Sequence, residues 1–292
     1  MLLLIVFIQR DNVIFCFSIR CVLCSMKTEQ FVHSEYSRCF AEATGTYFLV
    51  LTVGCNVMVM QAAGALSIGA MLMCMIFALG SVSGAHFNPA VTLAVYLSGR
   101  GCIGGRRMLY YMGAQCLGAL VAGLCYEVIF QTAFVLKPVG RYSVPMVMAV
   151  EVIYTMALCY VVLNVATTKA QAGNHYFGLA IGFTVVSAAV AIGQISNCCL
   201  NPAVALGSFI AALVAHGKNA FGDYTIYFFM PFFGSLFGTL AFYLVRRKDE
   251  YDPINVGLLM VNSDAKPADD SPVKYHTPAL RAVPMTNSDD DN

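Results

Sequence analysis

The residues of this chain best placed to do chemistry are two copies of one tripeptide, Asn88-Pro89-Ala90 and Asn201-Pro202-Ala203, each surrounded by apolar sequence. Proline suits the first turn of a helix, where its missing N–H is not needed, and the asparagine before it can cap that helix. Each asparagine can also offer a side-chain N–H to a passing oxygen atom. The pattern therefore predicts two short helices that each present an amide for hydrogen bonding.

The composition of the chain is that of a polytopic membrane protein. The chain has 292 residues, of which 59% are hydrophobic and only 11% are charged, whereas a soluble domain is about 25% charged. The formal net charge of +1 gives no electrostatic reason to expect nucleic acid as a partner. The sequence contains no nucleophile elbow, phosphate-binding glycine loop or metal-ligand helix motif. We therefore expect no enzyme activity, no cofactor and no bound metal.

Six apolar stretches approach the length of about 20 residues that a helix needs to cross a bilayer. They run approximately over residues 39–59, 65–82, 108–130, 144–166, 176–192 and 224–245. Two shorter apolar segments, 88–97 and 201–214, begin at the tripeptides and are long enough to cross only half of the membrane. Hydrocarbon cannot satisfy a broken backbone, so the chain before each short helix must be buried in protein or line a wet cavity.

The chain repeats itself, with one half at about residues 39–135 and the other at about 144–248. Glu42 stands 46 residues before Asn88, and Glu151 stands 50 residues before Asn201. Each half has three predicted spans, and the short segment follows the second of them. Because three is an odd number, the second half must enter the membrane from the opposite side. The pattern predicts an all-α membrane protein with an inverted repeat and a shared site near the midplane.

The basic residues predict that both termini are cytoplasmic. In that orientation the cytoplasmic face carries Lys27, Arg38, Arg100, Arg106, Arg107, Lys169, Arg246, Arg247 and Lys248, whereas the opposite face carries only Lys137, Arg141 and Lys218. Residues 1–38 precede the membrane domain, and we interpret 1–25 as a gene-model extension rather than a seventh span. Residues 249–292 are polar and end in an acidic run, which predicts a disordered cytoplasmic tail.

These motifs together resemble the aquaporin (major intrinsic protein) family. The resemblance rests on Ala41-Glu42-x-x-Gly45-Thr46, on the run from Ser83 to Thr92, on Glu151-x-x-x-Thr155, and on Asn201-Pro202-Ala203 followed by Leu206-Gly207. It covers roughly residues 41–245 and makes residues 39–248 an aquaporin-like channel domain. It implies a bundle of six transmembrane helices and two re-entrant half-helices, with one pore per subunit, assembled as a homotetramer.

The resemblance also implies roles for residues around the two tripeptides. Asn88 and Asn201 would hold a water at the midpoint of the pore. There the N-terminus of each half-helix contributes roughly half a positive charge, which opposes cations and protons. The pore would also be lined by backbone carbonyls, which belong to Gly84, Ala85, His86, Asn197, Cys198 and Cys199. His86 has an alternative role as a hydrogen-bonded core histidine that braces its segment.

Three glutamates, Glu42, Glu127 and Glu151, lie within predicted spans, where a charge is costly unless it is paired or hydrogen-bonded. One interpretation is that Glu42 and Glu151 relay protons, as in a transporter. The resemblance implies instead that each carboxylate accepts hydrogen bonds from backbone N–H groups of a re-entrant segment. We favour this loop-bracing role because the two glutamates occupy equivalent positions in the repeat.

The sequence departs from the family at the outer constriction of the implied pore. Most members continue the second tripeptide with arginine, whereas this chain has Val204. Spacing from the tripeptides places Ile68, Ala189 and Cys198 at the other three positions of this selectivity filter. Water-selective members usually have an aromatic residue at the first of these positions and histidine at the second. The predicted filter is wider and almost wholly apolar, so we expect relaxed selectivity among neutral solutes.

We expect a passive channel for water and for other small neutral solutes, such as ammonia, urea, hydrogen peroxide or glycerol. The channel would lie in the plasma membrane or in an intracellular vacuolar membrane. A secondary transporter is an alternative, because transporters also have broken helices and inverted repeats. A structural membrane or junction protein with a poorly conducting pore is a second alternative, because an apolar filter can lose its water.

Overall fold

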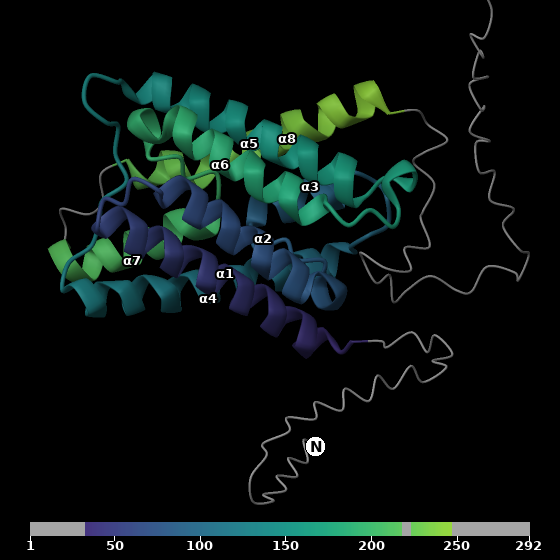
Figure 1. Cartoon of the computed structure of the whole chain (residues 1–292), viewed down its shortest axis with the longest axis horizontal. Helices are drawn as coiled ribbons and strands as arrows, with labels where there is room; N and C mark the ends of the chain where they lie inside the picture. The colour runs from purple at the N-terminus through teal and green to yellow at the C-terminus, as the bar shows by residue number, and fades with distance from the viewer. Residues whose placement is uncertain (1–32, 218–222, 247–292) are drawn as a thin grey trace, which may run out of the picture.

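The computed structural model describes residues 33–217 and 223–246, which are almost entirely helical. The α-helices are α1 (Glu35–Met58), α2 (Gly64–Ser83), α3 (Pro89–Leu97), α4 (Gly105–Phe130), α5 (Val144–Ala166), α6 (Phe177–Ser196), α7 (Pro202–His216) and α8 (Tyr224–Val245). A 3-10 turn, η1 (Lys169–Gln171), follows α5. Figure 1 shows the long helices lying side by side in one bundle. The predicted extension at 1–25 and the predicted tail at 249–292 lie outside the described residues.

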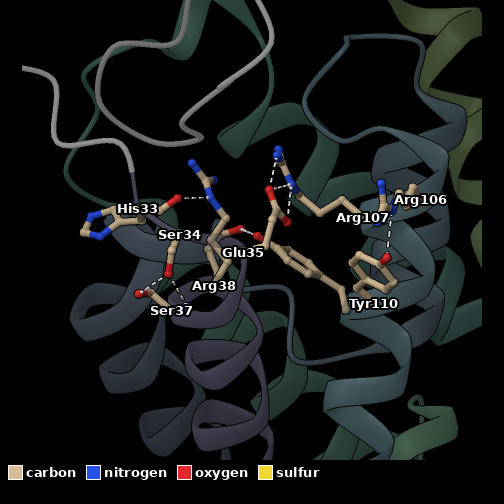
Figure 2. Close-up of polar contacts among 10 residues, drawn as sticks. His33, Ser34, Glu35, Ser37, Arg38, Arg106, Arg107 and Tyr110 are labelled. Atoms are coloured by element: carbon tan, nitrogen blue, oxygen red, sulfur yellow. Dashed lines mark hydrogen bonds and ion pairs between the residues drawn. The ribbon is translucent and has the colours of Figure 1, made fainter.

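The helix boundaries follow the predicted apolar stretches, with clear differences at two ends. α1 begins four residues earlier than predicted, because the Ser34 hydroxyl accepts a hydrogen bond of 3.1 Å from the Ser37 backbone N–H and caps the helix (Figure 2). α6 continues beyond the predicted end to Ser196, and Asn197 then ends it in a left-handed conformation. Apolar composition thus locates the core of each span, whereas capping residues decide where the helix stops.

Five helices in the described part of the chain are long and apolar enough to cross a membrane, namely α2, α4, α5, α6 and α8. α1 is absent from this set although it has 24 residues, which is about 36 Å of helix. Glu35, Arg38 and Glu42 make its first turns less apolar than those of the other long helices. α1 still packs along α2 and α4 within the bundle (Figure 1). All six predicted spans are therefore present as long helices, one of them less apolar than the rest.

The two halves of the chain pack in matched ways. α1 contacts α2 and α4 in the first half, as α5 contacts α6 and α8 in the second. Each short helix crosses into the other half, so that α3 packs against α5 and α8, and α7 packs against α1 and α4. α2 and α6 also meet across the two halves. Each half therefore helps to hold the short helix of the other, which places α3 and α7 at the centre.

Two glycines set the close approach of α2 and α6. A Cβ atom on Gly182 would lie 2.6 Å from the carbonyl oxygen of Gly69, and a Cβ atom on Gly69 would lie 2.6 Å from that of Gly182. Side-chain carbons do not approach a backbone oxygen so closely. Small residues at a membrane helix interface allow two backbones to come together in this way, and here the reciprocal contact requires glycine on both helices.

We predict that Gly182→Ala destabilises the bundle, because the added methyl group forces α2 away from α6. Overpacking of this kind costs about 1–3 kcal/mol, so the detergent-solubilised variant should unfold at a lower temperature than the parent chain. Gly193→Ala is the matched control on the same helix, since a Cβ atom there meets nothing within 4 Å. Equal unfolding temperatures for the two variants would contradict the proposed contact.

Candidate functional site

A cavity lies at the centre of the bundle, and we call it the central cavity. Its walls come from apolar faces of α1, α2, α5 and α6, and its middle comes from the two non-helical segments that precede α3 and α7. Val57 near the end of α1 and Ala166 at the end of α5 both line it. α1 and α5 occupy equivalent positions in oppositely directed halves, so these two residues lie towards opposite faces of the bundle.

The two non-helical segments have the same unusual backbone. Gly84 and Asn197, which follow α2 and α6, both have positive φ. Ala85 (φ 55°) matches Cys198 (φ 52°), and Phe87 (φ 50°) matches Leu200 (φ 52°). The left-handed region is costly for residues with a side chain, at roughly 1–3 kcal/mol each. Such backbones persist only where neighbouring groups hold them in place, so the contacts of each segment decide whether it keeps this shape.

The carboxylate of Glu42 holds the first segment. Its Oε1 accepts hydrogen bonds from the Ser83 hydroxyl at 2.6 Å and from the His86 backbone N–H at 3.0 Å. Its Oε2 accepts from the Phe87 backbone N–H and from the Gln115 side-chain amide, both at 2.8 Å. Glu42 is fully buried, and four donors surround the carboxylate. The hydrogen bonds offset the cost of burying this charge.

The carboxylate of Glu151 makes the corresponding contacts in the second half. Its Oε1 accepts from the Ser196 hydroxyl at 2.6 Å and from the Cys199 backbone N–H at 3.0 Å. Its Oε2 accepts from the Leu200 backbone N–H at 2.8 Å. Glu151 is also fully buried. Each buried carboxylate therefore binds two backbone N–H groups of the strained segment in its own half.

The two asparagines are joined to each other's segments. The Asn88 side chain caps α3 by accepting from the Ala90 backbone N–H at 2.8 Å, and its Nδ2 donates to the Leu200 carbonyl at 2.9 Å. The Asn201 side chain caps α7 by accepting from the Ala203 N–H at 2.9 Å, and its Nδ2 donates to the Phe87 carbonyl at 2.9 Å. Both asparagines line the central cavity. Each Nδ2 carries two hydrogens. The hydrogen bond to the opposite carbonyl uses one of them, and the other can still donate to another acceptor.

His86 takes part both in the cavity wall and in the core. Its Nδ1 lies 3.2 Å from the Thr92 hydroxyl, and its ring packs edge-on against Tyr111 with the ring centroids 5.5 Å apart. It is 6% exposed and also lines the central cavity. The two roles weighed for this residue, carbonyl in the wall and brace in the core, are therefore geometrically compatible.

The four predicted filter residues all line the central cavity. Ile68 comes from the first turns of α2, and Ala189 comes from the second half of α6. Cys198 lies in the second non-helical segment, and Val204 lies in the first turn of α7. The four residues come from four parts of the chain and border the same cavity, and none of them carries a charge.

Three residues that hold the segments were given no role from the sequence, although one of them, Ser83, begins the motif run from Ser83 to Thr92. The Ser83 hydroxyl donates to Glu42 and accepts from the Ala85 backbone N–H. In the same way, the Ser196 hydroxyl donates to Glu151 and accepts from the Cys198 backbone N–H. Each serine stands five residues before its asparagine, so the repeat carried a signal for both. Gln115 donates to Glu42 and to Thr92, and it lies on α4 with no equivalent pattern to mark it.

The described residues contain no group of three or more histidine, cysteine, aspartate or glutamate side chains that could hold a metal ion. The polar groups of the central cavity are amides, backbone groups, thiols and one imidazole. Its geometry therefore offers hydrogen bonds along a narrow, mostly apolar path.

Comparison with known proteins matches residues 28–242 to the family model described as major intrinsic protein. The chain is 31% identical over 252 residues to a probable aquaporin NIP-type of Nicotiana alata, which covers 82% of this chain and 85% of the relative. It is 34% identical over 220 residues to aquaporin NIP1-1 of Zea mays, which covers 70% of this chain and 73% of the relative.

Among solved structures the chain resembles the aquaglyceroporin from Plasmodium falciparum, with a TM-score of 0.61. The match covers 72% of this chain and 94% of that structure, at 23% sequence identity. At that identity the likeness establishes the all-helical fold alone. Together with the match to the family model, it identifies the chain as an all-α, multi-pass membrane protein.

We predict that Glu151→Gln and Glu42→Gln each destabilise the membrane domain by roughly 3 kcal/mol, because an amide NH₂ replaces an acceptor that faces buried donors. The thermal unfolding temperature of the purified protein should fall in both variants. Glu127→Gln is the matched control, since Glu127 is a half-buried glutamate of α4 that lies outside both segments. Wild-type unfolding of either test variant would contradict the role of the carboxylates in holding the segments.

Proposed function

Because the chain belongs to the major intrinsic protein family, we propose that its central cavity is a pore for water and other small neutral solutes that excludes ions and protons. The chain is a channel of this family and not an enzyme. The observation that carries the proposal is the pair of cavity-lining asparagines, Asn88 and Asn201, each cross-linked by a hydrogen bond to the opposite segment. This arrangement fixes both amides at the centre of the cavity.

The two amides supply the central donors of the proposed pore. The second Nδ2 hydrogen of Asn88 and that of Asn201 can each donate to the oxygen of a solute. A water held in this way has both acceptor positions of its oxygen occupied, so it cannot accept a proton from the next water in the file. The N-termini of α3 and α7 add partial positive charge at the same place. Both effects oppose the passage of protons and cations.

Backbone carbonyls supply acceptors along the proposed pore. Gly84, Ala85 and His86 line the cavity on one side of the asparagines, and Asn197, Cys198 and Cys199 line it on the other. Four of these residues, Gly84, Ala85, Asn197 and Cys198, have left-handed backbone. This backbone departs from the helical pattern, in which each carbonyl accepts a hydrogen bond from an N–H group of its own helix. These carbonyls can replace hydrogen bonds that a solute loses on leaving bulk water. The rest of the wall is apolar and offers little to slow the solute.

The filter determines how selective the proposed pore is. Ile68, Ala189, Cys198 and Val204 offer no strong donor and no fixed charge to a solute in the cavity. Val204 stands where an arginine would narrow the aperture and add a positive charge, and Ala189 stands where a histidine would do the same. We infer a wide filter that admits neutral solutes larger than water. The missing donors also reduce the compensation for lost hydration, so the aperture conducts water less well than its width alone suggests.

Exclusion of ions in this pore depends on its centre rather than its filter. With no arginine at the filter, the N-termini of α3 and α7 are the remaining source of positive potential along the pore. These N-termini lie near the midplane of the bilayer, where a cation also meets its largest desolvation cost. The central pair is therefore sufficient for exclusion of potassium and sodium, and the filter contributes to size selection alone.

We further propose that both termini are cytoplasmic and that four chains form a homotetramer with one pore each. The distribution of described basic residues supports the orientation, since Arg38, Arg106, Arg107 and Arg246 lie at the ends of α1, α4 and α8 that share one face. Lys137 and Arg141 lie in the connection between α4 and α5 at the other face. The plasma membrane and a vacuolar membrane both suit this topology. The hydrogen bonds of Glu42 and Glu151 with the segments occupy both carboxylates, so neither is free to serve as the midplane acid of a coupled transporter.

The proposal predicts permeability of reconstituted vesicles to water, urea and glycerol without permeability to protons or potassium. Stopped-flow light scattering of proteoliposomes measures the solutes, and a pH-sensitive dye measures the protons. Protein-free vesicles provide the baseline. A chain that conducts ions, or that accumulates solute only with an ion gradient, would contradict the channel proposal. Absence of any flux from correctly folded protein would favour the structural alternative.

We predict that Val204→Arg narrows the proposed filter, because a guanidinium then fills space beside Ile68 and Ala189. Glycerol permeability should fall at least tenfold, whereas water permeability should change by less than threefold, in keeping with the few kcal/mol that steric selection typically supplies. Val204→Leu is the control for added bulk without charge. Unchanged glycerol permeability in the arginine variant would place the constriction elsewhere in the pore.

A further inference from the structure

An open groove lies between the first turns of α1 and α4, and we call it the α1–α4 groove. Tyr36 and Cys39 line it from α1, and residues between Gly104 and Ala114 line it from α4. No residue that lines this groove also lines the central cavity. The groove is therefore a surface feature of the bundle that the proposed pore does not use.

The groove carries an excess of positive charge. Arg107 reaches across from α4 and binds the Glu35 carboxylate of α1 through both Nε and Nη2, which satisfies that carboxylate (Figure 2). Arg106 instead donates from Nε to the hydroxyl of Tyr110 on its own helix at 2.7 Å, with its guanidinium 5.3 Å from the centre of that ring. Within residues 33–217 and 223–246 no carboxylate forms an ion pair with Arg106. Among the described residues the Arg106 guanidinium therefore has no carboxylate partner.

Two of the residues that line the groove are glycines with open space beside them. A Cβ atom added to Gly104 or to Gly113 would meet no atom within 4 Å. Gly113 follows Arg106 by seven residues, which is about two turns or 10 Å along α4. Leu109 and Tyr110 lie between them at helical spacing, and Leu109 is 63% exposed. One face of α4 therefore runs from a cation at its first turn to an exposed apolar track further along the helix.

We propose that the α1–α4 groove binds an anionic phospholipid of the surrounding bilayer, with its phosphate against Arg106 and an acyl chain along Gly113 and Leu109. The charge and the apolar track lie in the order in which a phospholipid presents its headgroup and its chain. Tyr36 and Tyr110 sit at the headgroup end, where aromatic residues are favoured in membranes. Gly104 provides no side-chain cap for α4, so the first-turn N–H groups add to the attraction for a phosphate.

A lipid fits this groove better than a second copy of the chain does. A neighbouring copy would have to supply a carboxylate of its own for Arg106, because the carboxylate within the groove, Glu35, is already bound to Arg107. An anionic phospholipid brings its own negative charge and is present wherever the protein is embedded. The groove also opens towards the outside of the bundle at exposed apolar positions, which in a membrane face lipid.

The test is native mass spectrometry of the full-length protein released from nanodiscs of equal phosphatidylglycerol and phosphatidylcholine. The parent protein should retain phosphatidylglycerol in preference to phosphatidylcholine. Arg106→Gln should reduce retained phosphatidylglycerol about fivefold, the effect of one basic group near an anionic lipid surface, and Arg106→Lys should restore most of it. Gly113→Leu should reduce retention of both lipids, because its side chain fills the acyl track without a clash inside the protein.

Arg141→Gln is the matched control, since it removes an exposed arginine from the connection between α4 and α5. It should retain as much phosphatidylglycerol as the parent protein. Equal loss in Arg106→Gln and Arg141→Gln, or equal retention of the two lipids by the parent protein, would overturn the proposal. A change of oligomeric state in Gly113→Leu with unchanged lipid retention would also overturn it and would assign the groove to contacts between copies. Water permeability of all variants confirms that they fold.

Discussion

The structure depends on two buried carboxylates that satisfy the backbone where it cannot be helical. A bilayer offers no water to unpaired N–H groups, so a broken chain at that depth needs acceptors from the protein itself. Glu42 and Glu151 each accept from two backbone N–H groups of a left-handed segment, and a serine hydroxyl completes each set. Without these acceptors the segments would have to become helical and would fill the space that they now border.

The two asparagines connect the halves and define the polar centre. Because each Nδ2 donates to a carbonyl of the opposite segment, neither half can move its segment without disturbing the other. The same hydrogen bonds orient the second Nδ2 hydrogen of each asparagine, so the fold positions these donors before a solute arrives. Around this centre the cavity wall is apolar, and its filter residues carry no charge. A fixed polar centre with an apolar mouth is the physical basis of the relaxed neutral-solute selectivity that we propose.

Much of this arrangement could be predicted from the sequence because it depends on local patterns. The apolar stretches predicted all six long helices, and proline after asparagine predicted the starts of α3 and α7, which begin at Pro89 and Pro202. Helix ends were less accurate, because capping by Ser34 and the left-handed Asn197 depend on single residues rather than on composition. Gln115 was missed for a different reason, since its contact with Glu42 joins residues 73 positions apart that share no motif.

What the sequence determined by itself is the repeated framework of the protein. Long apolar stretches specify the spans, an odd number of spans per half specifies their inversion, and the residue after each tripeptide is known without any structure. Tertiary structure alone decided which groups meet: Asn88 with the carbonyl of Leu200, Gly69 with Gly182, and Arg107 with Glu35. The reason is that chain pattern acts over a few residues, whereas a polar contact in a membrane is selected by geometry across helices that are distant in sequence. The fold could therefore be predicted from the sequence, whereas the hydrogen-bond network that holds its centre open could not.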